Sequence, residues 1–255
     1  MSGIIWHIIT FGAIGFFLAV TVYRTLKIAR MPVHLKKELV QTPYDKNTSR
    51  YGGSYPYGFK RRHKPARRSR ITSIINTVSD ILLLTGALEH NKGLWPFTLS
   101  LHYGIYLAVA ALFLNILNAI FVIAELPMPA VYFLQGLGSV FALAGYLLGS
   151  LGTLGSIIKH YFDIRLKPFN TASTYFNLFF LGAFFISGAY AWFTLPDFTA
   201  SVSLFLKNLI TLNTRIAVTF ILSLHLVISL LFLIYLPLTN MIHFITKYFM
   251  YDEIQ

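Results

Sequence analysis

Cysteine is absent from this chain of 255 residues. Without thiolates, the chain cannot ligate an iron–sulfur cluster through cysteine, build a zinc–thiolate site or form a disulfide. Any metal that it holds must therefore be bound by histidine or by oxygen ligands. Eight histidines are available for that role.

Charged residues are also scarce. They make up 12% of the chain, whereas 56% of the residues are hydrophobic and the mean hydropathy is +0.64. Soluble domains carry roughly a quarter of charged residues, so this composition predicts a protein that crosses a membrane several times.

Acidic residues are rarer than basic ones, and the net charge is +12. Fourteen of the 21 basic residues lie between Arg24 and Arg70. A basic run can indicate binding to nucleic acid. Beside so much apolar sequence, membrane topology and attraction to anionic lipid explain it better. We therefore predict membrane lipid as a partner and no nucleic acid.

Five apolar stretches are long enough to cross a bilayer, because about 20 helical residues span its hydrocarbon core. These predicted spans are residues 3–22, 95–123, 130–158, 172–195 and 215–240. They predict an all-α fold, a polytopic membrane five-helix bundle. We expect residues 1–255 to form a single integral-membrane domain.

The first span differs from a cleaved secretory signal, because its positive charges follow the apolar run instead of preceding it. We expect an uncleaved anchor with the N-terminus outside. A basic cytoplasmic loop is expected over residues 24–72. The short apolar stretch 71–88 is interrupted by Asp80, which favours a helix in the membrane interface over a further span.

The distribution of basic residues supports this topology. With the N-terminus outside and the C-terminus cytoplasmic, 19 basic residues lie inside, and only Lys207 and Arg215 lie outside. Such an excess is typical of cytoplasmic segments. Residues 196–214 are expected to form an outer loop.

Two histidines in the last apolar stretch, His225 and His243, are 18 residues apart. In a continuous α-helix this spacing is five turns, so both imidazoles would lie on one stripe, about 27 Å apart along the axis. A titratable side chain inside a membrane is costly unless something pairs with it. The spacing therefore suggests axial ligands for metal centres.

His102 and His243 are expected near the inner ends of two antiparallel spans, at one membrane level. Two imidazoles at equal depth suit a haem b with one histidine on each side of the iron. Glycines in the third span would let neighbouring helices, or a flat cofactor, approach closely. The alternative is that both are ordinary interfacial histidines.

His225 is expected in the outer half of the membrane. A second haem there needs a ligand about ten residues after His102, where Leu112 and Phe113 cannot ligate iron. Three alternatives remain for His225: a second haem with an unexpected partner, a hydrogen bond to a quinone, or pairing inside the bundle. Glu125 and His7 are candidates for proton exchange.

Four stretches carry a resemblance to a known family: VYRTLKIARMPV, LWPFTLSLHYGIYL, YFNLFFLGAFFISG and SLHLVISLLFLIYLPLTNMIHF. In them the chain resembles the membrane cytochrome b subunits of the respiratory nitrate reductase gamma type. It is most similar to the branch in sulfite-reductase-linked and heterodisulfide-reductase-like complexes. The resemblance covers most of the chain.

The resemblance implies a ligand set. The family's last span supplies two histidines, which His225 and His243 match. Its second span usually supplies two more; His102 matches the first, and the second falls on Leu112. The resemblance thus implies an inner haem between His102 and His243, and the chain departs from the pattern at the outer haem.

The resemblance also implies a function. Such a chain would be a haem b-containing anchor subunit in a prokaryotic cell membrane. It would pass electrons between a menaquinone or ubiquinone pool and a cytoplasmic iron–sulfur subunit, with the catalytic chemistry in partner subunits. One alternative is a structural anchor or assembly subunit without a cofactor. A transporter is disfavoured, because polar residues inside the spans are few.

Overall fold

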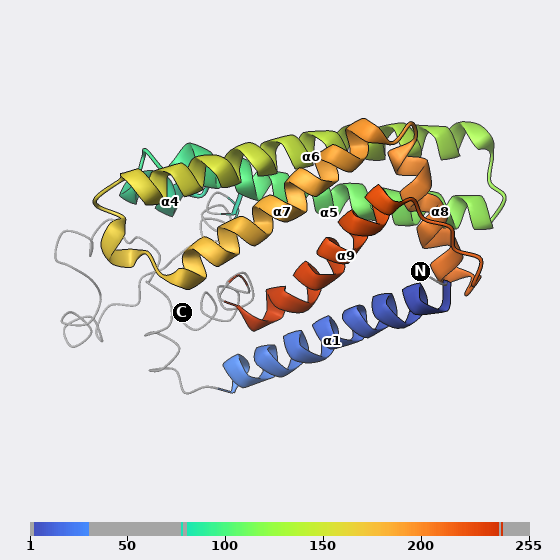
Figure 1. The fold of residues 1–255 in the computed structure, drawn as a ribbon, viewed down its shortest axis with the longest axis horizontal. Coiled ribbons are helices and arrows are strands. Elements are labelled where there is room, and N and C mark those ends of the chain that lie inside the picture. The colour runs from blue at the N-terminus through green and yellow to red at the C-terminus, as the bar shows by residue number, and fades with distance from the viewer. Residues whose placement is uncertain (1–2, 31–77, 79–80, 240, 242–255) are drawn as a thin grey trace, which may run out of the picture. The chain divides into compact units, whose positions relative to one another are not determined.

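The computed structural model describes residues 3–30, 78, 81–239 and 241 of the chain. All regular secondary structure in this described part is helical. Figure 1 shows the helices in chain order: α1 (Gly3–Ala29), α4 (Thr85–His90), α5 (Trp95–Ile123), α6 (Met128–Phe162), α7 (Ala172–Thr194), α8 (Phe198–Ile210) and α9 (Phe220–Tyr235). Two 3-10 turns, η3 (Lys167–Phe169) and η4 (Leu236–Leu238), follow α6 and α9.

The chain divides into two compact units. The first consists of Met1–Ala19 and Pro96–Leu238, and the second of Val20–Trp95 and Thr239–Gln255. Helices α6 to α9, nearly all of α5 and the N-terminal part of α1 belong to the first unit. His102, His225 and the hydrogen-bond partners described below for these two residues lie within it.

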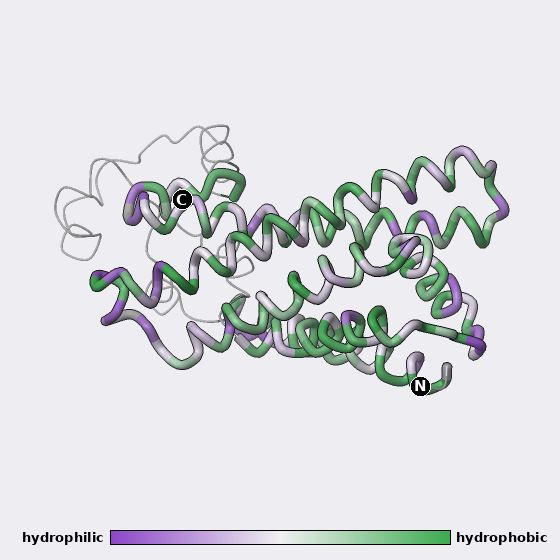
Figure 2. Tube along the Cα trace, turned by 45° about the horizontal axis from the view of Figure 1, so that its top comes forward, coloured by the Kyte–Doolittle hydropathy of each residue, from purple (hydrophilic) through white to green (hydrophobic). Residues whose placement is uncertain are grey.

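Five helices are long and apolar enough to cross a membrane: Gly3–Ala29, Trp95–Ile123, Met128–Phe162, Ala172–Thr194 and Phe220–Leu238. They confirm the predicted all-α fold with five spans. Figure 2 shows hydrophobic residues along the lengths of these helices. Many of their exposed side chains are large and apolar, as a surface that faces lipid requires.

The α-helix of the fifth span is shorter than the predicted stretch 215–240. It begins only at Phe220, where the Thr219 hydroxyl accepts a hydrogen bond from the backbone N–H of Leu222 and caps the helix. It ends at Tyr235, and the 3-10 turn η4 follows, with Pro237 in it. Proline has no backbone N–H and disrupts α-helical hydrogen bonding.

This change of helix type affects the expected register between His225 and His243. A 3-10 helix turns about 20° more per residue than an α-helix, so three residues shift the phase by about 60°. The assumption of an uninterrupted α-helix across Leu236–Leu238 is therefore wrong. His243 itself lies outside the described residues.

The predicted outer loop 196–214 contains a helix, α8, of 13 residues. Its inward face carries Phe198, Phe205 and Leu209, which are buried. Phe205 meets Trp6 of α1 edge to face, with ring centroids 5.4 Å apart. Burial of this apolar face stabilises α8, which is too short to cross a membrane.

Glycines bring α6 close to the helices on either side of it. A Cβ added to Gly104 of α5 would lie 2.5 Å from the Cα of Gly149 of α6, so the two backbones nearly touch. A Cβ on Gly149 would collide with the Phe185 ring of α7, and one on Gly155 with the Phe97 ring of α5. At these glycines the neighbouring helices α5 and α7 approach α6 closely.

The described part of the predicted interfacial helix 71–88 is not one continuous helix. Residues 81–83 are helical, Leu84 adopts a left-handed conformation with φ 48°, and α4 then runs to His90. The basic loop was expected to begin at residue 24, but it begins later, because α1 continues to Ala29. Residues 31–72 of that segment lie outside the described residues.

Candidate functional site

His225 lies on α9 and is 4% exposed. Both of its ring nitrogens lie at hydrogen-bond distance from hydroxyl groups on other helices. The Tyr146 hydroxyl of α6 is 3.0 Å from Nε2, and the Ser187 hydroxyl of α7 is 3.0 Å from Nδ1. One imidazole therefore joins three helices of the bundle.

A single tautomer of His225 satisfies all of these contacts. The Ser187 hydroxyl donates to the backbone oxygen of Phe184 at 3.0 Å, so its own oxygen is available to accept from Nδ1–H. Nε2 is then the unprotonated nitrogen, and it accepts the Tyr146 O–H. This tautomer is assigned from the hydrogen-bond network.

Aromatic rings enclose the His225 imidazole. The Tyr146 ring meets it edge to face at a centroid distance of 5.3 Å. Phe184 of α7 and Phe198 of α8 lie at 5.6 Å and 6.1 Å. These contacts correspond to the third alternative for His225, in which its side chain pairs with other residues inside the bundle.

An outer haem does not fit these contacts. Haem iron takes the lone pair of one imidazole nitrogen, and the Tyr146 hydroxyl already uses that of Nε2. On α5, the residue about ten positions after His102, where a second haem would need its ligand, is Leu112, which is apolar and 49% exposed. The neighbouring residues that are buried, Ala111 and Asn115, belong to another stripe of the helix.

His102 has a different geometry. It lies two turns into α5 and is partly buried, and its Nδ1 is 2.8 Å from the backbone oxygen of Thr98. A carbonyl oxygen only accepts, so Nδ1 carries the proton and Nε2 is the unprotonated nitrogen of the neutral ring. This is the arrangement in which a histidine ligates a metal through Nε2 while the other nitrogen fixes the ring. His102 therefore fits the role of an axial haem ligand.

The expected partner of His102, His243, lies outside the described residues. Of the two expected ligands of an inner haem, the structure therefore describes only His102, and His243 stays a prediction from the sequence.

The two candidates for proton exchange lie in different surroundings. His7 of α1 donates through Nδ1 to the backbone oxygen of Gly3 at 2.8 Å, and its Nε2 is buried without a hydrogen-bond partner in the described part of the chain. Glu125 is exposed in the turn between α5 and α6, with φ 52°. Neither residue is among the polar partners of His225.

Sequence reasoning missed a buried polar network between α5 and α8. The Ser203 hydroxyl donates to Asn115 Oδ1 at 2.9 Å and accepts from Asn118 Nδ2 at 3.3 Å. Asn115 Nδ2 donates to the backbone oxygen of Ala111 at 2.8 Å. The signal for this network was the i, i+3 spacing of the two asparagines, which places both on the buried face of α5.

A cavity of about 540 Å³ lies where α6 begins and α7 ends. Its walls include Tyr132, Trp192 and Phe198, and Trp192 Nε1 donates to the Ser139 hydroxyl at 3.0 Å. Of the described histidines singled out in the sequence, none lines it. The cavity therefore does not coincide with the candidate site.

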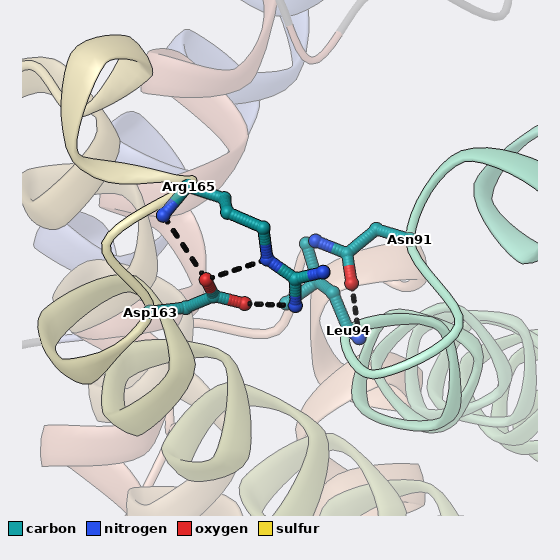
Figure 3. A network of polar contacts seen from close by, with 4 residues as sticks. All are labelled: Asn91, Leu94, Asp163 and Arg165. Atoms are coloured by element: carbon teal, nitrogen blue, oxygen red, sulfur yellow. Dashed lines mark hydrogen bonds and ion pairs between the residues drawn. The ribbon is translucent and has the colours of Figure 1, made fainter.

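The turn after α6 is held by polar contacts at the edge of the membrane-spanning region. Arg165 donates two side-chain hydrogen bonds to the Asp163 carboxylate, 3.0 Å and 2.9 Å long (Figure 3). These hydrogen bonds hold the pKa of the Asp163 carboxyl below its ordinary value.

In the second unit, Asn91 Oδ1 accepts from the backbone N–H of Leu94 at 3.0 Å, which fixes the turn before α5.

Comparison of the chain with protein-family models, curated proteins and solved structures found no match. The class that the fold defines is that of a multi-pass α-helical membrane protein.

Proposed function

We propose that this chain is the haem b-carrying membrane anchor subunit of a respiratory oxidoreductase complex, with His102 and His243 as the axial ligands. The hydrogen bond from His102 Nδ1 to the Thr98 oxygen supports this most directly, because it selects the tautomer that ligates through Nε2. The five spans and the resemblance of the sequence to membrane cytochrome b subunits agree with it.

The haem would supply one-electron transfer, and two histidine ligands would leave no open position for oxygen chemistry. The residues of this chain would hold and orient the group. Helix α5 fixes the His102 ring, and the apolar spans exclude water from its surroundings. Electrons would pass between a menaquinone or ubiquinone pool and a cytoplasmic iron–sulfur subunit of the same complex, in a prokaryotic cell membrane.

The test is an absorption spectrum of the purified chain after haem-replete expression. We expect a low-spin b-type spectrum that is lost in His102→Gln and in His243→Gln. His160→Gln is the matched control, because the His160 ring is already hydrogen-bonded to Asn170 at 2.6 Å at the end of α6. An intact spectrum in both ligand variants would contradict the assignment.

A second candidate function is a structural anchor or assembly subunit without a cofactor. The packing of Phe97 and Phe185 against the glycines of α6 favours it, because these glycines then serve the packing of helices and need no cofactor to explain them. Purified protein without a Soret band after haem-replete expression would support this function and exclude the first.

A further inference from the structure

We infer that His225 is the hydrogen-bonded tie between α6, α7 and α9 and not a haem ligand, so that the loaded chain carries a single haem, at the level of His102. The count of one haem rests on the proposed function; the role of His225 as a tie does not.

Both nitrogens of the His225 ring already have hydrogen-bond partners. Binding iron through Nε2 would displace the hydroxyl of Tyr146, a residue only 8% exposed, and leave that hydroxyl buried without its acceptor. Binding through Nδ1 would displace the Ser187 hydroxyl instead. In either case a buried polar group loses its partner, which costs more than the lost hydrogen bond alone.

Neighbouring side chains fill the space beside the His225 ring. A Cβ added to Gly188 of α7 would lie 2.5 Å from Cε1 of Tyr146, so the phenol ring rests directly on the α7 backbone. Phe184 and Phe198 cover other sides of the imidazole. Gly188 thus leaves room for the Tyr146 ring. Tyr146, Phe184 and Phe198 together occupy the space beside the imidazole that a porphyrin would need.

Helix α5 offers no iron ligand at the position where a second haem would need one. Leu112 cannot bind iron, and its side chain is about half exposed. The nearest buried polar residue is Asn115, whose amide nitrogen and oxygen are both hydrogen-bonded within the protein. No described residue at that level of α5 offers a nitrogen ligand.

The expected place of the quinone changes with this role of His225. The sequence placed the quinone near His225, but without a haem there the quinone would have to exchange electrons with the proposed haem at the level of His102. The family's second ligand position lies about 15 Å further along α5. Electron exchange with quinone then takes place on the His102 side of the membrane, and the half around His225 supports the bundle.

The test combines haem counting with thermal unfolding of the purified chain. His225→Gln, Tyr146→Phe and Ser187→Ala are each compared with wild type, and His102→Gln is the control for haem loss. Tyr235→Phe is the matched control for the tie, because it removes another hydrogen bond between α9 and α7, 2.6 Å long to Asn177, without touching His225.

We expect one haem per chain in wild type and in all three tie variants, each with a lower Tm than wild type. Tyr146→Phe combined with His225→Gln should lower the Tm by less than the sum of the single effects, because both remove the same contact. Tyr235→Phe combined with His225→Gln should be additive.

Two haems in wild type, with one lost in His225→Gln, would overturn the inference and leave the proposed function standing. Loss of the only haem in His225→Gln, in a chain that still folds, would also overturn it. No haem in wild type would refute the proposed function, and the Tm values would then decide the role of the tie alone. If His225→Gln does not accumulate, the haem count and Tm of Tyr146→Phe and Ser187→Ala decide the question.

Discussion

Histidines on α5 and α9 use their ring nitrogens differently. His102 donates through Nδ1 to a carbonyl of its own helix, which orients the ring. His225 uses Nδ1 and Nε2 for hydroxyls of two other helices. The hydrogen-bond partners of His225 show that it links three helices, which its residue type alone does not reveal.

A prediction at the residue scale concerns Asp163. Arg165 lowers the pKa of this carboxyl, so the pair stabilises the turn above the carboxyl's unfolded pKa, and the effect is lost as pH falls through the folded pKa. Asp163→Asn should therefore speed hydrogen exchange in the turn after α6 at neutral pH and have no effect in strong acid. The measurement is exchange of the amides around residue 165 by mass spectrometry. Equal exchange of variant and wild type at neutral pH would contradict this account.

At the scale of elements, the close approach of α5, α6 and α7 depends on glycine. Gly149 lies against Gly104 of α5 and the Phe185 ring of α7 at once. Alanine at position 149 would force the fully buried Phe185 ring to move, and overpacking of this kind costs about 1–3 kcal/mol.

Gly149→Ala should therefore lower the Tm of the purified protein. Gly136→Ala is the matched control on the same helix, because a Cβ at Gly136 meets nothing within 4 Å. Alanine also favours a helix more than glycine does, so the control should keep or slightly raise the Tm. Equal Tm values for the two variants would show that the close contact at Gly149 has no energetic role.

The helices that cross the membrane could be predicted from the sequence, because length and apolar composition decide them. Helix α8 was missed, since it is too short to span and its signal is only the spacing of Phe198, Phe205 and Leu209 on one face. The end of α9 was missed although Pro237 marks it. The partners of His225 could not be predicted, because Tyr146 and Ser187 are far from it in sequence and only the packed fold brings them together.

At the scale of the whole molecule, the excess of basic residues between the first and second spans predicts the N-terminus outside and the C-terminus in the cytoplasm. A reporter that is active only in the cytoplasm should therefore be active at the C-terminus and inactive at the N-terminus. The control is the same pair of fusions in a variant with the basic residues of 60–70 replaced by neutral ones, which should weaken the difference. The opposite orientation would place His102 at the outer face and contradict the proposed transfer to a cytoplasmic partner.

The proposed electron transfer by this membrane protein requires one haem b. It is tested most directly by the haem content per polypeptide of the purified wild-type chain, measured by the pyridine haemochrome method. We expect one haem b per chain. A chain that folds and remains free of haem after haem-replete expression would contradict it.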